Sequence, residues 1–244
     1  MLQIPTSYLT TQKRDQTMLT EQNGLTQFTD LEINKFYRNR KFGRLNPFLR
    51  KMYFLVKRLQ GSYSYEDQIK IACMCEPPMF FLNYGLMISH AYGITLSVDE
   101  IGCDVNIGQN VTLGTNGKYM ELGEHTTNHK PHIGNLVRFY SHAIVSGEIK
   151  IGDCVLVAAG AMVTKDVPSK SIVYGKNEVK PLSKHHINYL RAVLYHCERE
   201  YVKVPGLMYK NQKLFINDEY LKKREILLQN INSDDFEKNI NDLF

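Results

Sequence analysis

A spacing of six residues constrains this chain more than any other feature. Aliphatic or aromatic residues recur at every sixth position: Ile133, Phe139, Val145, Ile151, Val157 and Val163. Four residues after each lies a small or β-branched residue: Val137, Ala143, Ile149, Val155, Ala161 and Val167. The same phase appears upstream at Ile101, Ile107 and Leu113, with Val105 and Val111 in the second row. This period fits neither the helix repeat of about 3.6 nor the strand repeat of about 2.

A period of six predicts a prism with three flat sides of six residues each. The residues of the two rows point inward, and a small residue beside each corner, such as Gly134 or Gly152, lets the chain turn. The β-branched residues suit short parallel strands that are buried on their inner face. The alternative is an α/β protein with accidental spacing, but no helical pattern of sufficient length lies between the phased positions.

The phase breaks between Leu113 and Ile133, where residues 115–130 are polar and contain glycine. Such a segment cannot fill the strand register, so we expect it to leave the prism as an exposed loop. Long polar loops on a rigid scaffold are often functional. This loop carries His125 and His129, and His132 follows it.

The flanking regions have a different texture. Residues 1–75 are expected to form a mostly helical N-terminal cap, because apolar residues of Phe48–Leu59 recur at three- and four-residue intervals. Residues 76–182 are assigned to the prism and residues 183–244 to a helical extension. In that extension we expect helices at 184–201 and 218–230, separated by a turn at Pro205 and Gly206 and followed by a soft tail.

Composition excludes some classes of function. A formal net charge of +5 is too small to indicate nucleic-acid binding, and no window approaches the roughly 18 apolar residues of a membrane span. The five cysteines show no disulfide spacing, and no secretory signal begins the chain, so we expect free thiols in a cytoplasmic protein. The basic, amphipathic segment 36–59 is expected to cap the prism; a contact with the inner face of the membrane is the alternative.

Five ordered motifs over about residues 75–180 resemble the hexapeptide-repeat acyltransferases, in the branch of the serine acetyltransferases and the colanic-acid and capsule acetyltransferases. The motifs are Ile88–Ile94 with His90, Asn106–Gly114, Pro131–Gly134, Ala158–Pro168 and Val173–Lys176. The resemblance implies a left-handed parallel β-helix, a homotrimer, acetyl-CoA as donor and a site between subunits. The expected fold is therefore mainly β, with helical segments at both ends.

Transfer of an acetyl group from a thioester to an alcohol needs a base, donors for the tetrahedral oxyanion, and precise positioning. His90 suits the first role, because an imidazole transfers protons readily near neutral pH. Backbone amides of Gly114 and Thr115 are the candidates for the oxyanion, and His129 and His132 are further candidates near the loop. No covalent enzyme intermediate and no metal are required.

The sequence departs from the family pattern at several positions. The serine enzymes carry aspartates where this chain has Ser89 and Cys75, and the loop-exit histidine falls on Lys130. Glu76, a water or a backbone carbonyl could orient His90 instead. Small residues along the pantetheine path are replaced by Tyr140 and His142. The expected cofactor-binding residues are Ala143, Ala158, Ala159, Gly160, Lys165 and Lys176.

The first hypothesis is an O-acetyltransferase that modifies a sugar hydroxyl in a capsular, exopolysaccharide or other surface-glycan precursor. The alternative within the family is serine O-acetyltransferase. Two alternatives from other classes are a β-helix lyase with zinc held by His125, His129 and His132, and a non-catalytic binding module.

Overall fold

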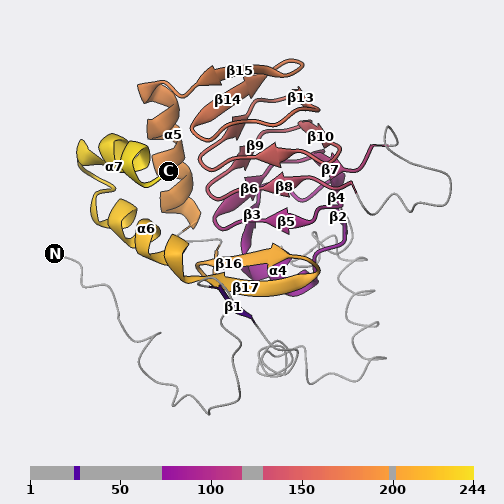
Figure 1. The fold of residues 1–244 in the computed structure, drawn as a ribbon, viewed down its shortest axis with the longest axis horizontal. Coiled ribbons are helices and arrows are strands. Elements are labelled where there is room, and N and C mark those ends of the chain that lie inside the picture. Colours follow the sequence, from indigo (N-terminus) through magenta and orange to yellow (C-terminus); the bar gives the residue numbers. More distant parts are fainter. Residues whose placement is uncertain (1–24, 28–72, 117–128, 198–201) are drawn as a thin grey trace, which may run out of the picture.

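The computed structural model describes residues 25–27, 73–116, 129–197 and 202–244 (Figure 1). Its strands wrap around one axis as the three faces of a prism. Face 1 contains β3 (Leu86–Ile88), β6 (Val105–Ile107), β9 (Arg138–Phe139), β12 (Leu156–Val157) and β14 (Ser171–Tyr174). Face 2 contains β2 (Cys73–Cys75), β4 (Ile94–Leu96), β7 (Thr112–Gly114), β10 (Ile144–Ser146) and β13 (Met162–Val163). Face 3 contains β5 (Glu100–Ile101), β8 (His132–Ile133) and β11 (Lys150–Ile151).

The predicted period of six is confirmed as the length of one side of the prism. Each strand pairs in parallel with the strand one coil away, and residues of the first row are direct partners. On face 1, Ile107 pairs with Phe139 and Phe139 with Val157, while Leu113 and Val145 pair on face 2. All residues of the two inward rows are at most 7% exposed. The core of the prism is therefore the two rows stacked from coil to coil.

The small residues beside the corners serve close stacking rather than turning. At the edge from face 3 to face 1, Gly102, Gly134 and Gly152 lie above one another. A Cβ at Gly102 would lie 2.7 Å from the Gly134 carbonyl carbon, and one at Gly134 would lie 2.7 Å from that of Gly152. The chain turns two residues later, at residues with left-handed φ of 51° to 56°: Asp104, Leu136 and Cys154.

Gly134→Ala is expected to destabilise the prism by about 1–3 kcal/mol, because the added methyl group meets backbone that cannot move without displacing the next coil. Urea unfolding followed by circular dichroism measures the loss. Gly114→Ala is the matched control, since a Cβ at Gly114 has no atom within 4 Å. Equal free energies of unfolding for the two variants would contradict this account of the stacked glycines.

Both ends of the prism are covered. At the end with the first coil, α4 (Met79–Tyr84) and the hairpin of β16 (Leu207–Lys210) and β17 (Lys213–Asn217) close the core. β16 pairs antiparallel with β5, and the rings of Phe81 and Tyr209 lie 6.0 Å apart. β1 (Leu25–Gln27) adds to β17. At the other end, β15 (Glu178–Pro181) pairs antiparallel with β14. Neither the hairpin nor α4 was expected from the sequence.

Helix α5 (Lys184–His196) covers the outside of face 1 (Figure 1). Ser183 caps its first turn, and its apolar side packs on Leu156 and Ile172. The predicted helix at 184–201 is confirmed as far as His196, and residues 198–201 lie outside the described part. α6 (Asp218–Gln229) matches the second predicted helix.

The prediction of a soft tail is wrong, because α7 (Asp235–Leu243) packs on α5 and α6 and buries Phe236 and Ile240. Its apolar residues recur at helical spacing and find a partner surface. None of the helices in the described residues is long and apolar enough to cross a membrane.

A buried ion pair ties α6 to the corner of the prism. Asp104, which is 0% exposed, accepts hydrogen bonds through Oδ2 from Arg224 Nε at 2.6 Å and from Tyr220 Oη at 2.8 Å. Burial raises the pKa of the Tyr220 phenol well above its ordinary value, so this group stays protonated and donates. The C-terminal extension is therefore held against the prism by an ion pair as well as by apolar contacts.

The N-terminal prediction falls largely on residues 1–24 and 28–72, which lie outside the described part; this includes segment 36–59. Among the described residues the first strand of face 2 is Cys73–Cys75, so the prism includes three residues before the predicted boundary. All five cysteines are free thiols, and Cys103, Cys154 and Cys197 are buried.

Candidate active site

The first coil of the prism has an enlarged corner between faces 1 and 2. Ile88 and Leu96 are the partners of Ile107 and Leu113 in the next coil. The step between the partners is eight residues in the first coil and six in the second. The corner of the first coil therefore contains two more residues than the corner of the second, and this bulge is formed by His90, Ala91 and Tyr92.

His90 lies on this bulge with its side chain exposed, and its φ of 56° is left-handed. Histidine is among the residues that tolerate this conformation. Ala91 is turned into the core, and Tyr92 is 70% exposed. Gly93 follows with φ 63°, where any Cβ would collide with the Asn110 side chain. The position of Asn110 thus requires glycine at the end of the His-Ala-Tyr-Gly motif. Gly93 in turn determines the shape of the turn that carries the His90 imidazole.

The predicted pantetheine path follows the same edge between faces 1 and 2. The corner residues of successive coils are Asn110, His142 and Gly160, all with left-handed φ, and Asn110 Nδ2 lies 3.1 Å from His142 Nε2. Ala159 and Gly160 are exposed, Ala158 is half-buried, and a Cβ at Gly160 would touch nothing within 4 Å. Ala143 is 0% exposed, so its side chain belongs to the core and not to this surface.

The opposite edge of face 2, toward face 3, holds a second group of predicted residues. Glu76 accepts hydrogen bonds from Ser97 Oγ at 2.9 Å and from Lys130 Nζ at 2.6 Å. Lys130 is 5% exposed, so its ammonium depends on this carboxylate. The Gly114 carbonyl accepts from the Gly147 N–H at 2.8 Å at the same edge. Ser146 Oγ donates to the Thr115 carbonyl at 3.4 Å.

The predicted histidines near the loop each face a carboxylate. His129 Nδ1 lies 2.9 Å from Glu148 Oε2, and His132 lies on face 3 between Asp99 and Glu100, at 4.0 and 3.7 Å. Lys165 follows β13 at the edge between faces 2 and 3, and Lys176 bridges to Met162 above face 2; both are exposed. His125 and most of the predicted loop lie outside the described residues.

Eight of the twelve predicted site residues thus form two groups, one on each long edge of face 2. His90, Ala158, Ala159 and Gly160 share one edge; Glu76, Gly114, Thr115 and His129 share the other. Between them lie the strands of face 2, of which four have three residues and are therefore about 10 Å long. Among the described residues of this chain, no side chain makes a hydrogen bond or ion pair with His90. A single copy therefore does not bring the two groups together, and Glu76 is engaged elsewhere.

One residue beside the His90 turn was not predicted from the sequence. Arg138, on the outer side of β9, reaches across the second coil and donates through Nη1 to Ser89 Oγ at 3.4 Å. The alternation of inward Val137 and Phe139 marks Arg138 as outward-facing. Only the fold shows that this outward position lies beside Ser89, two coils away.

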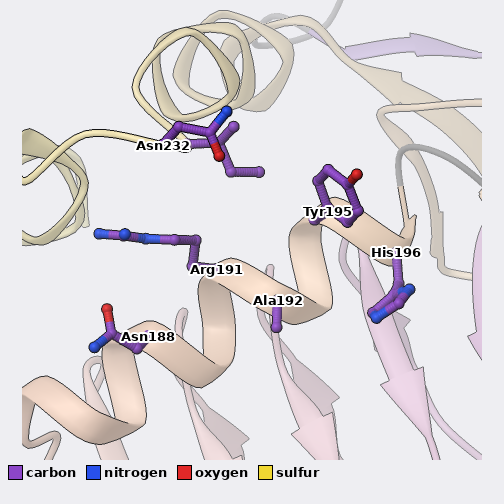
Figure 2. Close-up of a pocket in the computed structure, with 7 residues that line it drawn as sticks. Asn188, Arg191, Ala192, Tyr195, His196 and Asn232 are labelled. Carbon is purple, nitrogen blue, oxygen red and sulfur yellow. The ribbon is translucent and has the colours of Figure 1, made fainter.

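Figure 2 shows a separate pocket of about 360 Å³ between α5 and the segment after α6. Arg191, Tyr195 and Asn232 are among the side chains around it, and none of the predicted site residues lines it. Across the described residues, no three His, Cys, Asp or Glu side chains are grouped so that they could hold a metal ion.

The chain is similar to several curated acetyltransferases. It is 32% identical over 136 residues to a serine acetyltransferase of Helicobacter pylori, which covers 55% of this chain and 72% of that protein. It is 32% identical over 116 residues to the galactoside O-acetyltransferase of Escherichia coli, which covers 44% of this chain and 55% of that protein. No protein-family model matches the chain.

Among solved structures, the serine acetyltransferase of Neisseria gonorrhoeae is 30% identical, with a TM-score of 0.33 over 46% of this chain and 38% of that one. The match to the Helicobacter pylori enzyme extends over more than two thirds of that protein. It agrees with the five motifs and with the three-sided β-helix that carries them. The chain therefore belongs to the hexapeptide-repeat acetyltransferase family that includes the serine acetyltransferases, and it is an acyltransferase that takes its acetyl group from acetyl-CoA.

Proposed function

We propose that the protein is a serine O-acetyltransferase in which His90 is the general base. The observation that carries the proposal is the exposed His90 imidazole on an enlarged corner, in a chain with serine acetyltransferases among its relatives. These relatives give the serine acceptor more support than the sugar acceptor that we first expected. The lyase and binding-module alternatives are set aside, because the chain belongs to an acetyltransferase family.

The reaction needs no covalent intermediate on the enzyme. His90 takes the proton of the acceptor hydroxyl while the oxygen attacks the thioester carbonyl. The resulting tetrahedral oxyanion is held by backbone N–H groups, for which Gly114 and Thr115 are the candidates. The C–S bond then breaks, the ester is released, and the protonated imidazole returns its proton to the thiolate of CoA. A positioned base of this kind contributes about 10²–10⁴-fold to the rate.

We further propose that the site forms between copies in a homotrimer. Face 1 is covered by α5, and face 3 carries Glu100, His132 and Lys150. Among the described residues, the outward column of face 2 is uncharged: Met74, Thr95, Thr112, Ile144 and Met162. Met74 is 76% exposed in the single chain.

Packing face 2 of three copies around an axis brings the His90 edge of one copy to the loop edge of the next. That arrangement unites the two groups of site residues and supplies charges that a serine zwitterion can use. The Glu148 carboxylate at the loop edge is 54% exposed and can receive an ammonium. The Glu76 carboxylate is 41% exposed.

A sugar hydroxyl is the second candidate acceptor. The galactoside O-acetyltransferase of Escherichia coli is a relative at the same level of identity as the serine enzymes. Ser89 and Cys75 also replace the two aspartates of the serine enzyme pattern. These replacements remove carboxylates that would otherwise lie near the base and the acceptor ammonium.

The two acceptors are separated by measuring CoA release from acetyl-CoA with free serine and with galactosides and oligosaccharides in parallel. We expect turnover with serine that exceeds the acceptor-free rate at least about 100-fold, the lower end of what a positioned base contributes. The product is confirmed by mass spectrometry. Turnover with sugars and none with serine would contradict the serine acceptor and support a glycan acceptor instead.

The cytoplasmic location, the extent of loop 115–130, and a membrane contact through residues 36–59 remain predictions from the sequence. The last is tested by co-sedimentation with vesicles that contain anionic lipid, compared with neutral vesicles. Binding that requires the anionic lipid is the expected result if the basic segment lies on a membrane.

A further inference from the structure

The pocket of Figure 2 has the size of a small-molecule site. Its volume is about 360 Å³, and known ligand pockets begin at roughly 300 Å³. Asn188, Arg191 and Tyr195 share one side of α5, because they are three and four residues apart. Ile231 and Asn232, from the segment after α6, line the pocket from the other side. The pocket is therefore formed by two segments that only the tertiary structure brings together.

The local charge of this pocket is positive. None of the seven residues that line it is acidic, and Arg191 is among them. Along its 13 residues, α5 contains Lys184 and Arg191 but neither aspartate nor glutamate. The carboxylates nearest in sequence to the facing segment, Asp234 and Asp235, do not line the pocket. A pocket with a cation and without a carboxylate favours a negatively charged ligand.

The Arg191 guanidinium is held in position, but its charge is not balanced. Its Nη2 donates to the Ser233 carbonyl at 3.1 Å, and its central carbon lies 4.9 Å from the centre of the Phe236 ring. Its Nε is buried, and in the described structure it has no hydrogen-bond partner. Within the described ranges, Arg191 forms no ion pair with a carboxylate. A half-buried guanidinium in this state is completed by an anion.

The groups around Arg191 suit an organic anion. Asn188 lies one turn before it on α5, Asn232 lies on the facing segment, and both side chains are exposed (Figure 2). Side-chain amides donate hydrogen bonds to anionic oxygens without adding charge, and a guanidinium matches the geometry of a carboxylate or a phosphate. Ala192 and Ile231 provide apolar contact for a carbon skeleton.

We propose that this pocket binds a small organic anion, which Arg191 recognises through carboxylate or phosphate oxygens, with the amides of Asn188 and Asn232 as further donors. The site is separate from the acetyl-transfer site, because none of the residues predicted for catalysis or for donor binding lines it. The bound anion joins α5 to the segment before α7, so it stabilises the folded C-terminal extension. The proposal holds whichever acceptor the enzyme uses.

The test measures binding of inorganic phosphate and of malonate to the full chain by calorimetry. The protein is saturated with CoA, so that the donor site does not take up the probes, and chloride at equal ionic strength is the reference. We expect one saturable site per chain and a melting temperature that rises with anion concentration. Arg191→Met is expected to weaken binding at least about 10-fold, the lower value of a charge-assisted hydrogen bond.

Arg191→Met also loses the contacts with Ser233 and Phe236, so a second variant leaves these contacts in place. Asn188→Asp keeps the size of the side chain and adds a negative charge to the pocket. We expect it to weaken binding of both anions at least about 10-fold, because like charges in contact repel. Asn241→Asp, on α7 outside the pocket, adds the same charge and is the matched control. It should keep the wild-type affinity.

Four outcomes would overturn the proposal. A wild type with no saturable binding of either anion would refute it, and unchanged affinity in both Arg191→Met and Asn188→Asp would place the anion elsewhere. Equal weakening in Asn188→Asp and Asn241→Asp would reduce the effect to long-range charge. A raised KM for acetyl-CoA in Asn188→Asp would assign the pocket to the donor. Binding of one anion and not the other, lost in Asn188→Asp alone of the two Asp variants, would support the proposal and identify the group as carboxylate or phosphate.

Discussion

Replacing His90 with alanine is expected to lower kcat at least about 100-fold while leaving the Kd for acetyl-CoA unchanged. In the proposed mechanism the imidazole removes the proton of the acceptor hydroxyl, and a positioned base contributes about 10²–10⁴-fold. The residues predicted to bind the donor, Ala158, Ala159 and Gly160, lie on the edge above His90, so we expect acetyl-CoA binding not to depend on the imidazole. Steady-state kinetics of CoA release gives kcat, and calorimetry gives the Kd.

The conformation of the backbone requires a second variant. His90 has φ 56°, where alanine is strained, whereas asparagine tolerates the left-handed region. His90→Asn should therefore keep the turn and still lose the base, with the same fall in kcat. His185→Ala, on an exposed histidine of α5, is the control and should retain full turnover. Normal turnover in His90→Asn would remove the imidazole from the mechanism.

Arg224→Met is expected to destabilise the protein by about 3–5 kcal/mol, because it leaves the Asp104 carboxylate buried without its cation. The Asp104 side chain is 0% exposed, and its Oδ2 retains only the Tyr220 hydroxyl as a donor. Without its cation, the Asp104 carboxylate must either take up a proton or become exposed to solvent. Both changes lower the free energy of unfolding. Urea unfolding measures the difference in the free energy of unfolding.

Two comparisons make the Arg224 experiment specific. Lys223→Met breaks an ion pair with Glu219 on the same helix, and because the Glu219 side chain is 75% exposed, we expect a loss below about 1 kcal/mol. Adding Asp104→Asn to Arg224→Met removes the buried charge, and asparagine suits the left-handed φ of 51°. The double variant should recover part of the lost stability. A loss in Arg224→Met no larger than in Lys223→Met would show that the buried pair does not hold α6 to the prism.

Much of the fold was predictable because its information is local and repeated. Each coil places an inward residue every six positions, so the pattern from Ile101 to Val167 was sufficient to predict the prism, and every inward residue is buried. Helices α5 and α6 were predicted from the charged, Leu/Ile/Lys/Glu-rich composition of the last sixty residues and from the turn at Pro205 and Gly206 between them. The hairpin of β16 and β17 was missed, because its pairing with β5 joins residues about one hundred positions apart. The order of α7 was missed for a similar reason: its stability comes from packing on α5 and α6.

The candidate site was predictable only in part. The motif around His90 is contiguous in sequence, and the structure places His90 on an exposed, enlarged corner. The environment of the site was not predictable from the same information. Glu76 was considered as a partner for His90, but it binds Lys130, which is 54 residues away. Arg138 was not considered at all, although it reaches Ser89 across 49 residues.

The sequence by itself determined the three-sided repeat and its inward residues, because both follow from spacings of a few residues. The resemblance of the Ile88–Ile94 motif to the acyltransferases identified His90 as the candidate base. The tertiary structure decided which side chains neighbour one another across coils, which face α5 covers and which edge each predicted residue occupies. The physical reason is the stacking of the coils. Stacking brings residues that are one or two coils apart into contact. The length of the intervening loop, and not the local sequence pattern, determines which residues meet.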